Sequence, residues 1–269
     1  EIRAALIFLR HRCPPATRTP SPSPHISKGR TMSDTATLTY FHGRGRAEQS
    51  RWMLAAAGIA FKNRCLNSNE EFLKLKAEGL PFNVMPLLEI DGMKITQSQA
   101  INRFIARKAD LYGKNQKEAL FCDMLAEAVN DSIGGIMSYP FKTRSYWKEG
   151  KDQEGEKVGA ELLDSFISKH FPRIENRIKS NKEENKESPY SVGKSLTYAD
   201  VLIAALAHGY EEGKPNCLEK YPGIKEIHSL VIKLPGVKKY LTSSNYFPYP
   251  KGKVAIEYTT NVDTVLDRL

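Results

Sequence analysis

The chain has 269 residues, of which 41% are hydrophobic and 26% are charged, as in globular proteins that form one large or two modest domains. Its formal charge is +9, but residues 1–31 hold six basic residues against one acidic residue, which leaves +4 for the remainder. So small an excess argues against a dedicated nucleic-acid-binding protein. No hydrophobic run reaches the roughly 18 residues that a membrane helix needs, so we expect no membrane partner.

Residues 1–31 are basic, poor in acidic residues and rich in serine and proline. We expect them to form a leader outside the folded protein. The leader is either an organellar presequence or translated sequence upstream of a true start at Met32. In both cases it has little apolar surface to bury.

The segment 38–46 (LTYFHGRGR) places a tyrosine at the end of a predicted strand and an arginine at the start of a predicted helix. Aromatic and β-branched residues favour the strand, the two glycines mark a turn, and residues 47–57 read as a helix capped by Gly58. A helix N-terminus offers free N–H groups and partial positive charge. With Arg46, it would stabilise an anion hydrogen-bonded to the Tyr40 hydroxyl. The alternative is that Tyr40 is an ordinary core residue.

Residues 85–98 (MPLLEIDGMKITQS) contain two short apolar runs that flank Asp91-Gly92, a strong hairpin signal. Gln97 and Ser98 then begin a helix whose apolar positions fit a period of 3.6. The predicted order is strand, helix, strand and helix, followed by a hairpin of two strands and a further helix.

The chain from residue 114 onwards reads as helical. Residues 119–136 and 157–178 carry apolar side chains at three- and four-residue steps, as bundle helices do. The charged run 180–189 predicts a solvated loop.

Thr197 and Asp200 have the spacing of a capping box, with Leu196 and Val201 as its hydrophobic staple, ahead of the apolar run VLIAALA. This pattern predicts the start of a buried helix. It is a structural feature and indicates no chemistry.

The C-terminal residues 260–269 predict a short helix, with Thr260 and Asp263 capping its start. Its apolar face would comprise Val262, Val265, Leu266 and Leu269. So short a helix is unstable alone, so we expect it to dock on an open hydrophobic pocket as a lid; the alternative is a frayed terminus.

Cysteines and histidines show no spacing typical of a disulfide framework or a metal site. The four cysteines, at positions 13, 65, 122 and 217, are scattered and include no Cys-x-x-Cys pair. The six histidines lack the spacing of metal ligands. We therefore expect no metal and a reducing, cytoplasmic location.

The motifs YFHGRGRAE at 40–48, MPLLEIDGMKITQS at 85–98 and LTYADV at 196–201 together resemble the cytosolic glutathione transferases. The resemblance extends from about residue 37 to 249 and is closest to the alpha, mu and sigma branch, which uses a catalytic tyrosine. It implies an α/β plus all-α fold. The expected parts are a thioredoxin-like domain at 32–113, an all-helical domain at 114–250 and a tail at 251–269.

This resemblance implies that the protein binds glutathione as a co-substrate and activates its thiol as a thiolate that attacks small hydrophobic electrophiles, without a metal. Tyr40 would donate a hydrogen bond to the thiolate, and Arg46 would add a positive field. The other glutathione contacts that it implies are Phe72, Lys76, Met85, Pro86, Gln97, Ser98 and Asp131.

Each of these contacts has an implied role. A cis Met85-Pro86 bond would turn the backbone of Met85 outward to pair with the peptide part of glutathione. Gln97 and Ser98 would bind the γ-glutamyl carboxylate at a helix N-terminus. Lys76, beside Phe72, would lie near the glycine end, or would be an ordinary solvated lysine.

Two further positions imply a homodimer. Asp131 falls where the family carries an aspartate that reaches the neighbouring subunit's site and meets the γ-glutamyl ammonium. Phe82 falls where alpha- and mu-type members carry an aromatic key for a pocket on the partner. Alternatively, Phe82 packs within its own domain.

The class and the reaction have alternatives. Val84 stands where alpha-type enzymes carry a glutamine, and Met85 with Gln97-Ser98 looks more like the sigma class. A glutathione-dependent isomerase of the prostaglandin type would use the same thiolate. A lens crystallin or ligand-storage protein on this fold would not need the site residues.

Overall fold

The computed structural model describes residues 36–268. The expected leader, residues 1–31, lies outside the described residues. Within this range no helix is both long and apolar enough to cross a bilayer.

The N-terminal part is built on a four-stranded sheet of order β2-β1-β3-β4. Strand β1 pairs in parallel with β2 and antiparallel with β3, which pairs antiparallel with β4. The β3–β4 hairpin turns at Asp91 and Gly92, both with positive φ, as predicted. Because β4 runs in the direction of β1, the ends of β1, β2 and β4 and the start of β3 meet at one edge of the sheet. The strands are β1 (Ala36–Phe41), β2 (Phe61–Leu66), β3 (Leu87–Ile90) and β4 (Met93–Thr96).

Three helices connect or follow these strands, together with two short 3₁₀ turns. Helix α1 ends as predicted: Gly58 has a φ of +67°, and the N–H groups of Gly58 and Ile59 bond to the last carbonyls of the helix. The fold of this part is thioredoxin-like. Its helices are α1 (Glu48–Ala56), α2 (Asn69–Ala77) and α3 (Ser98–Lys108), and its turns are η1 (Gly45–Ala47) and η2 (Pro81–Asn83).

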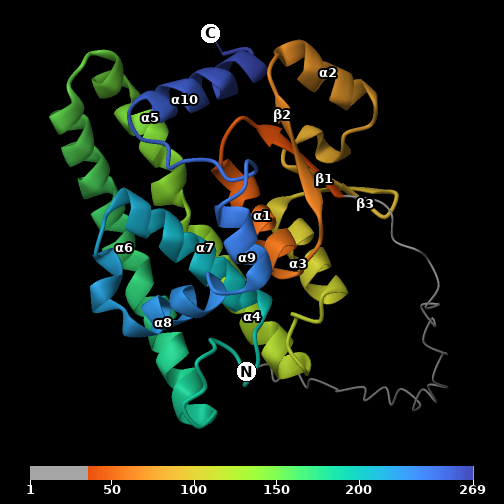
Figure 1. Ribbon diagram of the computed structural model, residues 1–269, viewed down its shortest axis with the longest axis vertical. Coiled ribbons are helices and arrows are strands. Elements are labelled where there is room, and N and C mark those ends of the chain that lie inside the picture. Colours follow the sequence, from red (N-terminus) through yellow and green to blue (C-terminus); the bar gives the residue numbers. More distant parts are fainter. Residues whose placement is uncertain (1–35, 269) are drawn as a thin grey trace, which may run out of the picture. The chain divides into compact units, whose positions relative to one another are not determined.

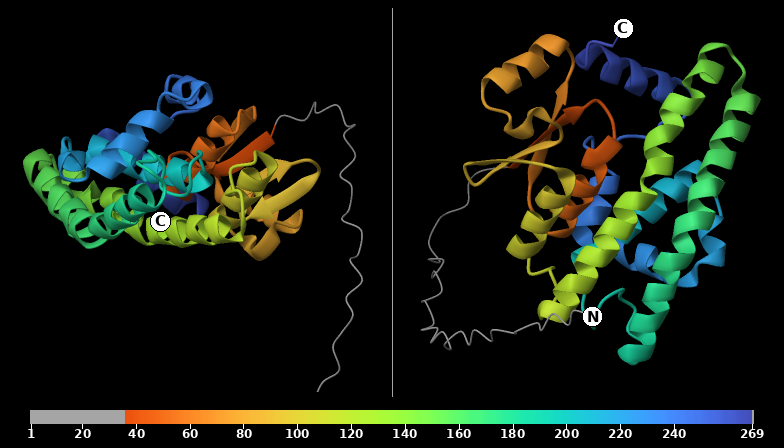
Figure 2. Two further views of the ribbon diagram at one scale, coloured as in Figure 1. Left: turned by 90° about the horizontal axis from the view of Figure 1, so that it is seen from below. Right: turned by 180° about the vertical axis from the view of Figure 1, so that it is seen from behind.

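The C-terminal part is helical, and this confirms the predicted fold class (Figure 1). The long helices α5 and α6 pack side by side, as Figures 1 and 2 both show. The apolar helix α7 is buried along most of its length and contacts α1, α4 and α8. The helices are α4 (Gln116–Ser132), α5 (Gly134–Lys148), α6 (Asp152–Glu184), α7 (Tyr198–Gly213), η3 (Cys217–Lys220), α8 (Pro222–Val231), α9 (Pro235–Leu241) and α10 (Lys253–Val265).

The single helix predicted over 119–136 is wrong, because α4 ends at Ser132 and α5 begins at Gly134. The glycines at this junction allow close packing: a Cβ on Gly134 would lie 2.8 Å from the Phe166 ring, and one on Gly135 would lie 2.5 Å from the Tyr210 hydroxyl. Close approach of α6 and α7 therefore explains the glycines.

The charged run 180–189 is not wholly a solvated loop, because α6 continues to Glu184. Asn181 is buried inside the run. Its amide donates to the carbonyls of Tyr190 and Gly193 at 2.8 and 3.0 Å, and it accepts from the N–H of Gly193 at 2.9 Å. One face of the run is thus anchored, and only the other face is solvated.

A C-terminal helix forms as predicted, but its start was predicted wrongly. It begins at Lys253, and Thr260 lies inside it. Asp263 forms an ion pair with Arg144 on α5 and caps nothing. Val262 and Val265 are buried, so the apolar face was predicted correctly at these two positions.

The predicted capping box at the start of α7 is present. Asp200 is fully buried and accepts hydrogen bonds from the N–H of Ser191, the N–H of Thr197 and the Thr197 hydroxyl, at 2.7, 2.8 and 2.9 Å. This carboxylate therefore joins the loop before α7 to the helix itself.

Replacing Asp200 with alanine should lower the free energy of unfolding by about 2–4 kcal/mol, because buried donors lose their acceptor. Urea denaturation measures the loss. The exposed Asp152, in the first turn of α6, is the matched control, and its alanine variant should lose less than about 1 kcal/mol. Equal losses would contradict the structural role of Asp200.

Candidate active site

The sheet edge where β1, β2 and β4 end collects most of the predicted site residues. Tyr40 lies near the end of β1, Pro86 directly precedes β3, and Gln97 follows β4. Phe72 and Lys76 lie on α2, which follows β2. The topology of the sheet therefore brings together segments that are up to about 60 residues apart in sequence.

Tyr40 is buried, and its hydroxyl oxygen accepts a hydrogen bond from the backbone N–H of Arg46 at 3.1 Å. Burial raises the pKa of Tyr40, against the opposing effect of hydrogen bonds from Arg46 and Tyr258 and of the charges on Arg51 and Arg46. The phenol therefore stays protonated at neutral pH and keeps a proton to donate. The Arg46 side chain is exposed, so its main contact with Tyr40 is through the backbone.

The segments expected to hold the peptide part of glutathione are formed as predicted. The Met85-Pro86 bond is cis, and Met85 is half-buried. Gln97 is the N-cap of α3 with a φ of +67°, and Ser98 is the first residue of that helix. Backbone N–H groups at a helix start are suited to binding a carboxylate.

Of the remaining predicted glutathione contacts, Lys76 and Phe72 touch each other, whereas Asp131 lies at the surface. The ammonium of Lys76 lies 4.3 Å from the centroid of the Phe72 ring, so the two residues form a cation–π pair. Asp131 is exposed near the C-terminal end of α4.

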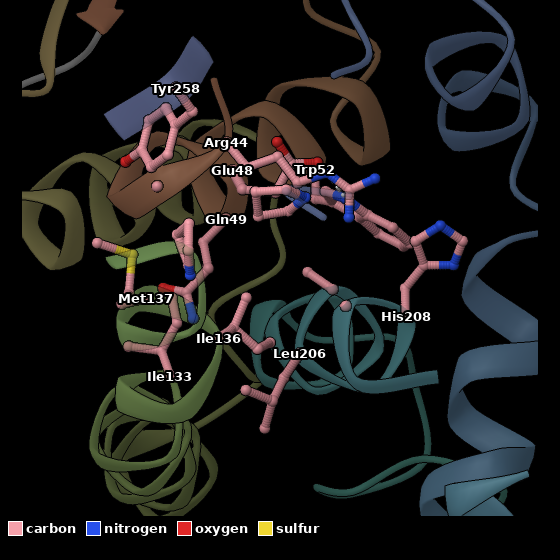
Figure 3. Close-up of a pocket in the computed structure, with 15 residues that line it drawn as sticks. Arg44, Glu48, Gln49, Trp52, Ile133, Ile136, Met137, Leu206, His208 and Tyr258 are labelled. Atoms are coloured by element: carbon pink, nitrogen blue, oxygen red, sulfur yellow. Dashed lines mark hydrogen bonds between the residues drawn. The ribbon is translucent and has the colours of Figure 1, made fainter. Parts of the chain in front are cut away.

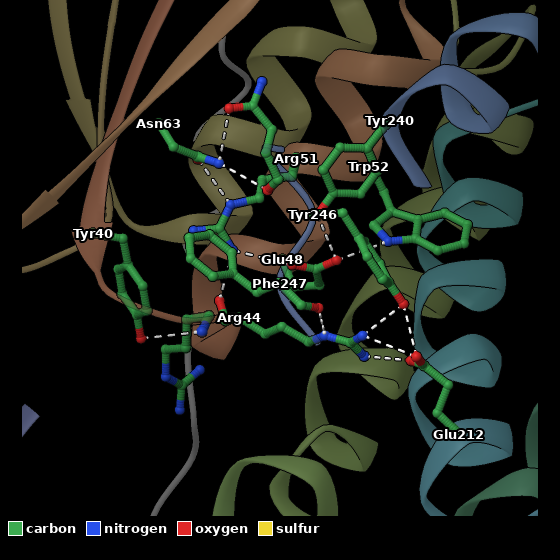
Figure 4. Close-up of polar contacts among 12 residues, drawn as sticks. Tyr40, Arg44, Glu48, Arg51, Trp52, Asn63, Glu212, Tyr240, Tyr246 and Phe247 are labelled. Atoms are coloured by element: carbon green, nitrogen blue, oxygen red, sulfur yellow. Dashed lines mark hydrogen bonds and ion pairs between the residues drawn. The ribbon is translucent and has the colours of Figure 1, made fainter. Parts of the chain in front are cut away.

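A buried ion pair that we did not predict fixes the turn after β1 (Figure 4). The Arg44 guanidinium makes a two-pronged contact with the Glu212 carboxylate on α7. It also donates to the Tyr246 hydroxyl at 2.6 Å and to the Phe247 carbonyl at 2.7 Å. Burial would lower the pKa of Arg44, but Glu212 outweighs that effect and raises it. The turn is therefore bound to the helical part of the molecule.

Arg51 of α1 forms a second buried pair and was also missed (Figure 4). It donates to the Arg44 carbonyl at 3.1 Å, to Glu48 at 3.0 Å and to Asn63 of β2 at 2.9 Å. Glu48 also accepts from Trp52 and Tyr240. The signal in the sequence is the Glu48–Arg51 spacing of three residues on one helix.

An apolar cleft lies between α1, α5, α7 and α10 (Figure 3). Gly45 and Tyr258, which both contact Tyr40, line it. Gln49 is buried in its wall and accepts from Gln99 at 3.4 Å, but its own amide nitrogen has no partner within residues 36–268. The walls of the cleft are thus mainly hydrophobic. Its other lining residues are Arg44, Glu48, Trp52, Ile133, Ile136, Met137, Pro140, Ala205, Leu206, His208, Gly209 and Pro250.

The part of the chain that the structure describes contains neither a disulfide nor a metal-binding group. Cys65, Cys122 and Cys217 are free thiols. Burial raises the pKa of Cys122 and of Cys217 to about 12, so these two thiols are inert at neutral pH. Residues 36–268 contain no group of three or more His, Cys, Asp or Glu residues that could hold a metal ion.

Family models and a curated relative identify the chain. The model of the glutathione S-transferase N-terminal domain matches residues 36–107, and that of the C-terminal domain matches residues 137–244. "Glutathione S-transferase alpha-5" of Rattus norvegicus is 38% identical over 211 residues, which cover 78% of this chain and 90% of the relative. The chain belongs to the glutathione S-transferase family. It is an enzyme of the glutathione transferase type.

Two solved structures resemble this transferase. A monomeric glutathione S-transferase, Na-GST-3 of Necator americanus, is 32% identical with a TM-score of 0.61, over 77% of this chain and 96% of the other. Prostaglandin synthase D of Nilaparvata lugens is 27% identical with a TM-score of 0.59, over 78% of this chain and 98% of the other.

The network around Arg44 extends to a pair of histidines in the transferase interior. His208 lies 2.9 Å from the Tyr246 hydroxyl and 3.2 Å from a ring nitrogen of His228. Burial, with a smaller contribution from His208, lowers the pKa of His228 to about 4 from its usual 6.5. The folded protein therefore resists protonation of this ring.

The free energy of unfolding should fall as pH drops from 6.5 towards 4, because the unfolded chain takes up a proton at His228 that the folded chain does not. Each unit of pKa difference between the folded and unfolded states corresponds to about 1.4 kcal/mol. We therefore expect His228 to account for a loss of a few kcal/mol in the free energy of unfolding. In urea denaturation at several pH values, His228→Asn should flatten this dependence. The exposed His42 is the control; an equal effect of His42→Asn would contradict the prediction.

Proposed function

We propose that this transferase binds glutathione at the sheet edge around Tyr40 and activates its thiol as a thiolate, in the manner of the tyrosine-type classes. The observation that most directly supports this proposal is the environment of the Tyr40 hydroxyl. It is buried at the meeting point of three strand ends, accepts the Arg46 N–H at 3.1 Å, and stays protonated because burial raises its pKa. It can therefore donate its proton to a sulfur anion.

The free energy that this requires is modest. A free thiol has a pKa of about 8.5, so only a few per cent is ionised near pH 7. Lowering the pKa by about two units requires the thiolate to be favoured by about 2.7 kcal/mol. One short O–H···S⁻ hydrogen bond in a site with nearby positive charge supplies an effect of this size.

The rest of glutathione would lie along the same edge. Met85 would pair with its peptide backbone, and the γ-glutamyl carboxylate would bind at the N-terminus of α3, beside Gln97 and Ser98. Lys76, held over Phe72, would meet the glycine carboxylate.

The electrophile would enter the apolar cleft that Gly45 and Tyr258 line. Its hydrophobic walls favour small apolar molecules.

An isomerase reaction is the second candidate. The similarity to prostaglandin synthase D of Nilaparvata lugens supports this candidate. An isomerase would use the same glutathione thiolate. Product analysis separates the two. A transferase releases a glutathione conjugate, whereas an isomerase returns its glutathione unchanged.

We also propose a homodimer in a reducing compartment such as the cytoplasm. Phe82 is 80% exposed and so does not pack within its own domain. Leu120 and Met124 are exposed one turn apart on α4, which also carries Asp131. A partner subunit that covers these side chains would bring Asp131 of this subunit close to the glutathione site of the partner. The free thiols at positions 65, 122 and 217 support the compartment.

Tyr40→Phe should retain glutathione binding while raising the pKa of the bound thiol towards its free value. Turnover near neutral pH should fall about ten-fold or more, because each unit of thiol pKa changes the thiolate fraction by about that factor. Ultraviolet titration of the bound thiolate measures the shift. A titration unchanged by the substitution would contradict the role of Tyr40.

Phe82→Ser should weaken the dimer by a few kcal/mol, because it leaves a cavity in the pocket of the partner, and should shift the protein towards monomer at low concentration. Sedimentation velocity measures the change. Leu73, which is 53% exposed on α2, provides the control substitution Leu73→Ser. A monomeric wild type would exclude the dimer. A Phe82→Ser variant that remains as dimeric as the wild type would exclude the proposed role of Phe82 in the dimer.

A further inference from the structure

The two glycines of the turn after β1 make room for two side chains, Tyr40 of β1 and Tyr258 of α10. A Cβ on Gly43 would lie 2.3 Å from a ring carbon of Tyr258. A Cβ on Gly45 would lie 2.5 Å from the Tyr40 hydroxyl and 2.7 Å from the Tyr258 hydroxyl. Real Cβ atoms cannot approach so closely, so these positions require glycine. Both hydroxyls therefore lie over Gly45.

Polar contacts on two sides fix the position of α10 and hence of Tyr258. Asn261 accepts from the N–H of His42 at 2.8 Å and donates to the carbonyl of Leu66 at 2.9 Å, so it joins the ends of β1 and β2. On the other side, Asp263 pairs with Arg144 of α5. Figure 1 shows α10 running between α5 and α2, above the sheet edge. These contacts of α10 therefore hold the buried Tyr258 ring at the site.

A hydrogen bond between the two phenols would take its direction from their surroundings. Tyr40 must keep its own proton for the sulfur, so its oxygen is the acceptor, as it already is for Arg46. Tyr258 is almost fully enclosed, and burial raises its pKa well above 10, so it keeps its proton and donates it. A hydrogen bond in this direction would lower the pKa of Tyr40, against the effect of burial, and would raise the pKa of Tyr258, in the same sense as burial.

We propose that Tyr258 is a positioning residue of the active site, whose hydroxyl donates to the Tyr40 oxygen and so makes Tyr40 a stronger hydrogen-bond donor to the glutathione thiolate. Hydrogen bonds in a chain polarise one another, and the effect is larger in a site with little water. The proposal rests on the proposed function of Tyr40. It adds that docking of α10 sets the acidity of the bound thiol, in addition to covering the cleft.

The test is Tyr258→Phe, which keeps the ring that fills the space over Gly43 and removes only the hydroxyl. The pKa of the enzyme-bound glutathione thiol, followed by ultraviolet titration, should rise by about 0.5 to 1 unit. The rate near neutral pH should fall about three- to ten-fold and recover at high pH. The melting temperature and the dissociation constant of S-methylglutathione, which has no thiol proton, should change little.

A double-mutant cycle separates an effect through Tyr40 from a direct one. In the Tyr40→Phe background, Tyr258→Phe should no longer shift the thiol pKa, because the residue through which it acts is gone. Tyr210→Phe is the matched control, since it removes a buried hydroxyl that donates to the Ser132 carbonyl at 2.6 Å. It should lower the melting temperature and leave the thiol pKa unchanged.

A chain ending at Lys251 tests the coupling to α10. It should reproduce the pKa shift of Tyr258→Phe and also raise the Michaelis constant for apolar electrophiles. The proposal is overturned if Tyr258→Phe leaves the thiol pKa unchanged or lowers it, or if it shifts the pKa equally without Tyr40. If Tyr40→Phe alone leaves the thiol pKa unchanged, the proposed role of Tyr40 fails first and this proposal fails with it.

Discussion

The geometry of the site depends on a buried charge that must be paired. The Arg44 side chain is almost fully enclosed, and an unpaired guanidinium there would cost several kcal/mol. Glu212 of α7 and the Tyr246 hydroxyl supply the pairing, so the turn after β1 can take only the conformation in which Arg44 reaches them. That same turn directs the Arg46 N–H at the Tyr40 hydroxyl. The thioredoxin-like part thus carries the phenol, and the helical part holds it in place.

Burial acts in the same direction on every phenol near the site. It raises the pKa of Tyr40 and of Tyr258, so both keep their protons across the physiological range. A protonated phenol can donate to an anion without losing its own proton. A sulfur anion at this edge would therefore be held by hydrogen bonds, with the phenol never ionised.

The features predicted correctly depend on chemistry within a few residues. The turn between β3 and β4, the Gly58 cap and the Thr197–Asp200 capping box are each local patterns. The features missed depend on partners far along the chain: Arg44 pairs with a residue 168 positions away. Tyr258 could not be placed either, because the start of α10 was predicted at Thr260 whereas the helix begins at Lys253, after Gly252 with its φ of +58°. Placing that start required knowing which segments α10 docks against.

The arginines around Tyr40 do not act as one positive field. Arg44 and Arg51 are buried, where charge is little screened, but each has its own carboxylate, Glu212 and Glu48. Each carboxylate offsets much of the positive charge of its arginine. Arg46 is exposed, so water and salt screen its side chain. The hydrogen bond that does reach the Tyr40 hydroxyl comes from the backbone N–H of Arg46 at 3.1 Å, and we propose the Tyr258 hydroxyl as a second donor. We therefore expect the stabilisation of a thiolate here to depend more on these hydrogen bonds than on the guanidinium groups.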